Sequence, residues 1–240
     1  MKKLMLFLCF LILTTNAYAS LEVIGTATYE GEDYKLIYMD NGPFGPITWL
    51  DYTNKTTNTT ENNFYTWAEQ LAWANGLGAE LLVTLNEGYI TSADWSVGWR
   101  LPETVDRRDI GGNGPWDGAY HITTSEMSYL FYEELENKGA YDIDGNTQSN
   151  HGLLFTGDFD HLTDYSYWSG TEYSGDTGNA WRFYFGLGAL YYWDKDGLDV
   201  GLAVFPGEVS RVPLPGAFLM LGSGIAGLGA IRKFAKRRFR

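Results

Sequence analysis

Two short acidic segments place side-chain oxygen atoms at alternate positions around a glycine. The first contains Asp194, Asp196 and Asp199, and the second contains Asp142, Asp144 and Asn146. Ca²⁺ prefers such hard oxygen donors and takes about six to eight of them from a loop that wraps around the ion. Both segments lack the downstream Glu of an EF-hand loop, and acidic glycine turns are also common between strands. Each segment is therefore either a calcium site or a solvated turn.

Aromatic residues make up 16% of the chain, including nine Trp and seventeen Tyr. Three tryptophans stand beside turns and polar residues and are candidates for stacking on sugar rings: Trp95, Trp116 and Trp193. Five others lie in apparent strands, helices or motifs, where a large ring is expected in the core: Trp49, Trp67, Trp99, Trp168 and Trp181. Arg100 and Arg182 lie among aromatic residues, which predicts buried salt bridges or stacking on rings.

Nucleophilic catalysis has little support in the sequence. The only histidines are His121, His151 and His161, and no G-x-S-x-G motif occurs. The thirty acidic residues offer many carboxylate pairs of the kind that glycoside hydrolysis needs, but no pair is singled out. We therefore predict a protein without catalytic residues, with a carbohydrate-active hydrolase as the alternative.

The first nineteen residues have the three parts of a secretory signal peptide. Lys2 and Lys3 form the basic start, residues 4–13 are apolar, and Ala17 and Ala19 form an A-x-A cleavage site before Ser20. Residues 1–19 should therefore be removed by signal peptidase after Sec export. The only cysteine, Cys9, lies within this segment, so the mature chain should have no disulfide, catalytic thiol or Cys-ligated zinc.

The other end of the chain has a short proline motif, an apolar segment and a basic cluster. The motif is Val212, Pro213, Leu214 and Pro215, and the uncharged residues 216–231 predict a transmembrane helix. The basic tail, residues 232–240, contains Arg232, Lys233, Lys236, Arg237, Arg238 and Arg240. This cluster places the C-terminus in the cytoplasm. Residues 212–240 resemble the PEP-CTERM sorting signal, in which Val-Pro-Glu-Pro is the common motif. The resemblance implies exosortase as a partner, transient tethering to the inner membrane and cleavage near the prolines.

The segment between these ends predicts strands, then two helices, then strands again. The expected strands are residues 22–29, 34–39, 47–52, 167–169, 180–185, 190–193 and 200–205. The expected helices are residues 64–77 and 126–135, the second with a capping box of Thr123 and Glu126. This order predicts an α+β fold.

Several motifs in this segment resemble the Lcl C-terminal domain family. They are Trp49-Leu-Asp-Tyr52, Trp67-Ala-Glu-Gln-Leu-Ala72, Trp99-Arg-Leu-Pro102, Tyr167-Trp-Ser-Gly-Thr-Glu-Tyr173 and Ala180-Trp-Arg-Phe183. The match covers residues 47–209 of a domain at 20–211. Phe205 stands where the family usually has Arg. The resemblance implies a C-type-lectin-like fold, similar to the formylglycine-generating-enzyme-like fold, with two helices packed on a twisted antiparallel sheet.

The charge of the chain narrows the choice of partner. The net charge is −13, but residues 20–211 alone hold nine basic and thirty acidic residues, a net charge of −21. Nucleic acid is excluded by this balance, and sulfated polymers are disfavoured relative to neutral glycans. We expect a non-enzymatic protein that binds neutral glycan, exopolysaccharide or another envelope component. It would pass through the inner membrane to the cell surface or extracellular matrix of a Gram-negative-type bacterium. A purely structural matrix component is a further alternative.

Overall fold

The computed structural model describes residues 21–40, 42–55, 64–106 and 118–212. Ten strands are found in this part of the chain: β1 (Leu21–Tyr29), β2 (Glu32–Met39), β3 (Ile47–Asn54), β4 (Leu82–Leu85), β5 (Tyr89–Thr91), β6 (Ser166–Glu172), β7 (Asn179–Tyr184), β8 (Ala189–Asp194), β9 (Gly201–Pro206) and β10 (Val209–Arg211). The helical segments are α1 (Trp67–Gly76), η1 (Leu77–Ala79), α2 (Glu126–Tyr129) and the π-helical η3 (Leu130–Glu134).

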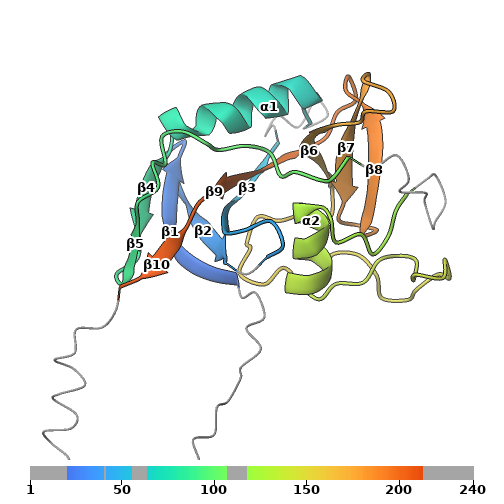
Figure 1. Cartoon of the computed structure of the whole chain (residues 1–240), viewed down its shortest axis with the longest axis horizontal. Coiled ribbons are helices and arrows are strands. Elements are labelled where there is room, and N and C mark those ends of the chain that lie inside the picture. The colour runs from blue at the N-terminus through green and yellow to red at the C-terminus, as the bar shows by residue number, and fades with distance from the viewer. Residues whose placement is uncertain (1–20, 41, 56–63, 107–117, 213–240) are drawn as a thin grey trace, which may run out of the picture.

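The fold is mainly β, so the predicted α+β class and its C-type-lectin-like arrangement of two helices on a sheet are wrong. Helix α1 has ten residues, and α2 with η3 adds nine. Most buried side chains come instead from two antiparallel sheets, which lie toward opposite ends of the molecule in Figure 1. The individual strands predicted from the sequence are confirmed, while β4, β5 and β10 were missed.

The larger sheet has five strands in the order β4-β1-β2-β3-β9, and all neighbours are antiparallel. Its two faces are both buried. In β9, Leu202 and Val204 belong to one hydrophobic cluster, and Ala203 and Phe205 belong to another. Because successive side chains of a strand point to opposite faces, this near-continuous apolar run packs on both sides.

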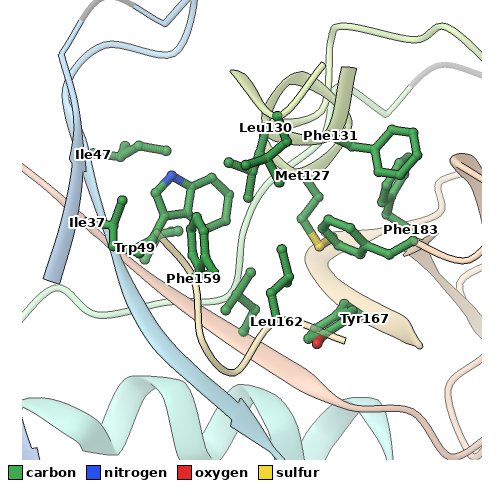
Figure 2. Packing of buried hydrophobic residues seen from close by; sticks show 14 of the residues in the cluster. Ile37, Ile47, Trp49, Met127, Leu130, Phe131, Phe159, Leu162, Tyr167 and Phe183 are labelled. Atoms are coloured by element: carbon green, nitrogen blue, oxygen red, sulfur yellow. The ribbon is translucent and has the colours of Figure 1, made fainter. Parts of the chain in front are cut away.

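The first hydrophobic cluster joins the five-stranded sheet to the smaller sheet, β6-β7-β8, and to α2–η3. Figure 2 shows its large side chains, among them Trp49 from β3, Phe131 from η3, and Phe183 from β7. Phe131 and Phe183 meet edge to face with ring centroids 5.4 Å apart. One face of the smaller sheet is thereby buried in this core.

The first helix starts later than expected, and the second has a different capping residue from the predicted one. Thr66 caps α1 in a capping box with Glu69, so this helix begins at Trp67. Ser125 caps α2, and its side chain accepts a hydrogen bond from the backbone N–H of Ser128. The predicted capping box of Thr123 and Glu126 is therefore wrong.

The predicted sorting segments fall outside the described residues. These are the signal peptide with Ala17, Ala19 and Ser20, then Pro213, Leu214 and Pro215, and residues 216–240 with the basic cluster; Val212 is the last described residue. Within the described ranges, no helix has the length and apolar character needed to cross a membrane. The C-terminal transmembrane helix of the predicted fold thus has no counterpart among these residues.

Candidate functional site

The outward face of the smaller sheet carries a cavity of about 340 Å³. Arg182 and Tyr184 of β7 lie on the same face as Tyr191 and Trp193 of β8, because alternate residues of a strand share a face. The other residues that line the cavity are Gly118, Tyr120, Leu187 and Ala189. The lining is thus dominated by aromatic rings around a single arginine.

Arg182 is the central polar residue of this cavity. Its guanidinium carbon lies 4.3 Å from the ring centroid of Tyr191 and 4.5 Å from that of Trp193. The same guanidinium forms an ion pair with Asp199. The prediction that Arg182 makes a buried salt bridge or stacks on rings is therefore confirmed, in both forms at once. The Arg182 Nε–H is buried and has no hydrogen-bond partner among the described residues.

Asp199 supports the cavity from the protein interior and is only 7% exposed. Burial raises the pKa of its carboxyl group to about 6, although the charge and hydrogen bond of Arg182 lower it. Its backbone carbonyl accepts hydrogen bonds from Gln70 Nε2, at 3.2 Å, and from the backbone N–H of Tyr65, at 2.9 Å. At neutral pH, Asp199 thus cancels the positive charge of Arg182.

This arrangement separates the three aspartates of the first predicted calcium segment. Asp194 is the exposed last residue of β8, and its carboxylate accepts a 2.9 Å hydrogen bond from the backbone N–H of Asp196 in the exposed turn that follows. Asp199 instead faces Arg182. The structure therefore does not bring the three carboxylates together.

In the second segment, the Asp142 carboxylate accepts hydrogen bonds from the backbone N–H groups of Asn146 and Asp144, at 2.8 and 2.9 Å. These bonds, those from Asn146 foremost, hold the pKa of Asp142 below its ordinary value. Across the described ranges, no three His, Cys, Asp or Glu residues are grouped in a way that could hold a metal ion. Calcium binding remains a prediction.

The three tryptophans predicted to stack on sugars have different surroundings. Trp193 is 49% exposed and lines the cavity. Trp95 packs at a ring-centroid distance of 4.3 Å against Phe205, in the cluster on the far face of the five-stranded sheet. Trp116 lies outside the described residues. Of the five tryptophans expected in the core, Trp67 is partly buried and the other four are buried.

The sequence interpretation missed three tyrosines of the cavity. Tyr184 and Tyr191 could have been found from strand alternation, since each is two residues from Arg182 or Trp193. Tyr120 has no such signal, because it comes from a segment that reaches β8 through the bridge between Ala119 and Leu190.

Comparisons of the chain with protein-family models, with curated proteins and with solved structures give no match. The resemblances to the Lcl C-terminal domain and to the PEP-CTERM signal therefore remain predictions.

Proposed function

We propose that this chain is an exported, non-enzymatic protein of the cell surface or extracellular matrix, and that the cavity on β7 and β8 binds a ring of a neutral glycan. The observation that carries the proposal is Trp193, a half-exposed ring at an aromatic cavity whose one cation is already neutralised. A signal peptide at 1–19 and an exosortase-type signal at 212–240 would deliver the protein through signal peptidase and exosortase.

The chemistry of the cavity suits a sugar ring. Ligand sites combine an apolar, aromatic lining with a few polar groups that set orientation. Tyr and Trp present an apolar ring face to C–H groups together with a polar edge. Here the rings of Tyr191 and Trp193 supply the apolar surface, and Arg182 is the charged residue in the lining that can orient a sugar ring.

Charge favours a neutral glycan over an acidic one. The Arg182 guanidinium is compensated by Asp199, so the cavity offers hydrogen bonding without net charge. Residues 20–211 carry a net charge of −21, which repels sulfated or carboxylated polymers.

The hydrolase alternative finds less support at this cavity. Glycoside hydrolysis uses two carboxyl groups that flank the scissile bond, about 5–9.5 Å apart. None of the described residues that line the cavity is acidic. The carboxylate that pairs with Arg182, that of Asp199, is buried and engaged in this ion pair. Binding without turnover is therefore the better reading of this geometry.

The test is a binding measurement on the full chain with neutral polysaccharides, such as a glucan, a mannan and a galactan, and with heparin as a sulfated comparison. Trp193→Ala should weaken binding of a neutral polysaccharide about tenfold, which corresponds to ~1.4 kcal/mol. Tyr165→Ala, which removes another exposed ring away from the cavity, should leave binding unchanged.

The outcomes separate the three functions. Retention of the polysaccharide without release of shorter products supports the proposal. Product release would replace it with the hydrolase. Absence of binding to any of the polymers would leave the purely structural matrix component and overturn the proposal.

A further inference from the structure

The ring of Trp193 is half exposed, yet two groups lie close against it. The guanidinium carbon of Arg182 is 4.5 Å from the ring centroid. On Gly197, in the turn after β8, an added Cβ atom would lie 2.4 Å from Cδ1 and 2.5 Å from Nε1 of the ring. Real Cβ atoms essentially never approach another heavy atom within 3.0 Å. The ring can therefore take this position only beside a residue without a side chain.

The backbone at Gly197 does not itself require glycine. Its φ lies outside the left-handed region, unlike that of Gly188 in the preceding turn, where φ is +68°. The added Cβ would also lie 2.9 Å from the carbonyl oxygen of Asp194, just inside the limit of 3.0 Å. Its overlap with the ring of Trp193 is much deeper. The ring is thus the main reason that this position accommodates only glycine.

The turn that carries Gly197 is fixed to other parts of the fold through Lys195. The backbone N–H of Lys195 donates to the carbonyl of Gly178 at 2.9 Å, and its carbonyl accepts from the N–H of Trp67 at 3.1 Å. The side chain of Lys195 forms an ion pair with Glu172. These contacts tie the turn to β6, to the segment before β7 and to the start of α1. Gly197 therefore belongs to a supported turn rather than to a free loop.

A second ring of the cavity, Tyr184, has a similar neighbour. An added Cβ atom on Gly186, in the turn after β7, would lie 2.6 Å from Cε2 and 2.8 Å from Cζ of Tyr184, and 2.9 Å from the carbonyl oxygen of Asp164. The φ of Gly186 also lies outside the left-handed region. Two rings that line the cavity thus each lie against a glycine in the turn that follows their strand.

Close packing of a protein core does not account for the contact at Gly197. Gly201 shows what such packing looks like, because its added Cβ would meet Oε1 of the fully buried Gln70 at 2.2 Å. Trp193, in contrast, is 49% exposed. A side chain on the surface ordinarily keeps much of its rotamer freedom, and a ligand that orders it loses affinity. A ring that is already held in place avoids that loss.

We propose that Gly197 is a positioning residue of the aromatic cavity, and that its missing side chain lets the turn after β8 hold the Trp193 ring against Arg182 for a neutral glycan. Gly197 acts through Trp193 and need not touch the ligand. The inference rests on the proposed function, because it takes the neutral glycan as the ligand of the cavity.

The binding experiment uses the full chain with a glucan, a mannan and a galactan. Gly197→Ala should weaken binding of the neutral polysaccharide about three- to tenfold, because the displaced ring must be ordered again by the ligand. In the background of Trp193→Ala, the same substitution should have no further effect on binding. Gly76→Ala is the matched control, since Gly76 has φ −80° and open space around its Cα, and it should leave binding unchanged.

NMR relaxation of the Trp193 indole N–H tests the positioning without any ligand. Its signal is identified as the one that Trp193→Ala removes. In the unsubstituted chain its order parameter should be close to that of a rigid backbone, about 0.85, and Gly197→Ala should lower it below about 0.6. Gly76→Ala should leave it unchanged. The measurement on the unsubstituted chain does not depend on whether any variant folds.

The outcomes decide the role of Gly197. A mobile indole in the unsubstituted chain would overturn the proposal, as would an indole that is equally rigid in Gly197→Ala. An equal loss of affinity in the presence and absence of the Trp193 ring would overturn it too, because Gly197 would then act through the turn alone. Absence of binding by the unsubstituted chain would overturn the proposed function and the role of Gly197 in glycan recognition. The relaxation data would still show separately whether Gly197 holds the ring.

Discussion

Arg100 and Glu126 form a two-point ion pair, in which two guanidinium nitrogens each donate to one carboxylate oxygen at 2.8 Å. Glu126 is 1% exposed and also accepts a 2.7 Å hydrogen bond from the backbone N–H of Glu103. Arg100 is tied to β9 through its bridge with Val204. The pair therefore joins the start of α2 to the five-stranded sheet, and it confirms the salt bridge predicted for Arg100.

Glu126→Gln should lower the free energy of unfolding by about 3 kcal/mol, because it leaves the guanidinium of Arg100 without its buried counter-charge. Urea unfolding would measure the loss. Glu103→Gln is the matched control. Its carboxylate is 62% exposed and lies 3.6 Å from Arg100, so its removal should change stability by less than about 1 kcal/mol. Equal losses in the two variants would contradict this assignment.

Arg182→Met should destabilise the protein by about 3–5 kcal/mol at pH 7, because Asp199 is then a buried carboxylate without a partner. The pKa of Asp199 is already about 6, and loss of Arg182 removes the group that lowers it. At pH 5 the carboxyl group would be protonated in the folded variant, so the penalty should be smaller there. Urea unfolding at the two pH values checks this. A penalty that does not change with pH would show that Asp199 is not its source.

Asn137→Ala should cost about 2–3 kcal/mol, because the part-buried N–H and carbonyl of Phe155 lose their partner and the N–H of Leu154 keeps only its bond to the carbonyl of Gly152. Asn86→Ala, which removes a single exposed hydrogen bond to the carbonyl of Val23, should cost less than about 1 kcal/mol. Hydrogen exchange at the amides of Leu154 and Phe155 should accelerate only in the first variant. Unchanged exchange at these amides would contradict the assignment of Asn137 as their hydrogen-bond acceptor.

The buried tyrosines should make the fold sensitive to alkali. Burial raises the pKa of Tyr120 to about 12 and holds the pKa of Tyr52 and Tyr132 well above the ordinary value. Because the folded pKa exceeds the unfolded one, this contribution to stability is complete below pH ~10 and is lost as pH rises through the folded value. Tyr120→Phe should raise the midpoint of alkaline unfolding, monitored by phenolate absorbance. Tyr165→Phe, at an exposed ring, should leave the midpoint unchanged.

Local hydrophobic patterns in the sequence were sufficient to predict many individual strands and helices. Apolar alternation predicted the first three strands, and the structure places them at β1, β2 and β3. Strand β4 escaped prediction because apolar residues occupy both its faces, with Leu82 exposed at 69%. The second helix was located correctly, but its cap was not, because the side chain of Glu126 turns to Arg100 rather than back to the helix start.

The residues of the candidate site were likewise only partly predictable from the sequence. Composition and spacing identified Trp193 and Arg182 as residues of interest, since their type and position in a strand are properties of the chain alone. Asp199 was grouped with Asp194 by sequence spacing, yet it lies between β8 and β9 in a bridge with Tyr65, and its buried side chain is compensated by Arg182. Tyr120 joins the cavity only through a bridge between segments about seventy residues apart.

What the sequence by itself determined is therefore the order of the longer strands and the two helices, the excess of acidic charge and the residue types available for binding. The tertiary structure decided the mainly β fold, the partner of each buried charge and the residues that line the aromatic cavity. The physical reason is that secondary structure depends on periodicity over a few residues. Charge compensation and cavity shape depend instead on which distant segments the two sheets bring together.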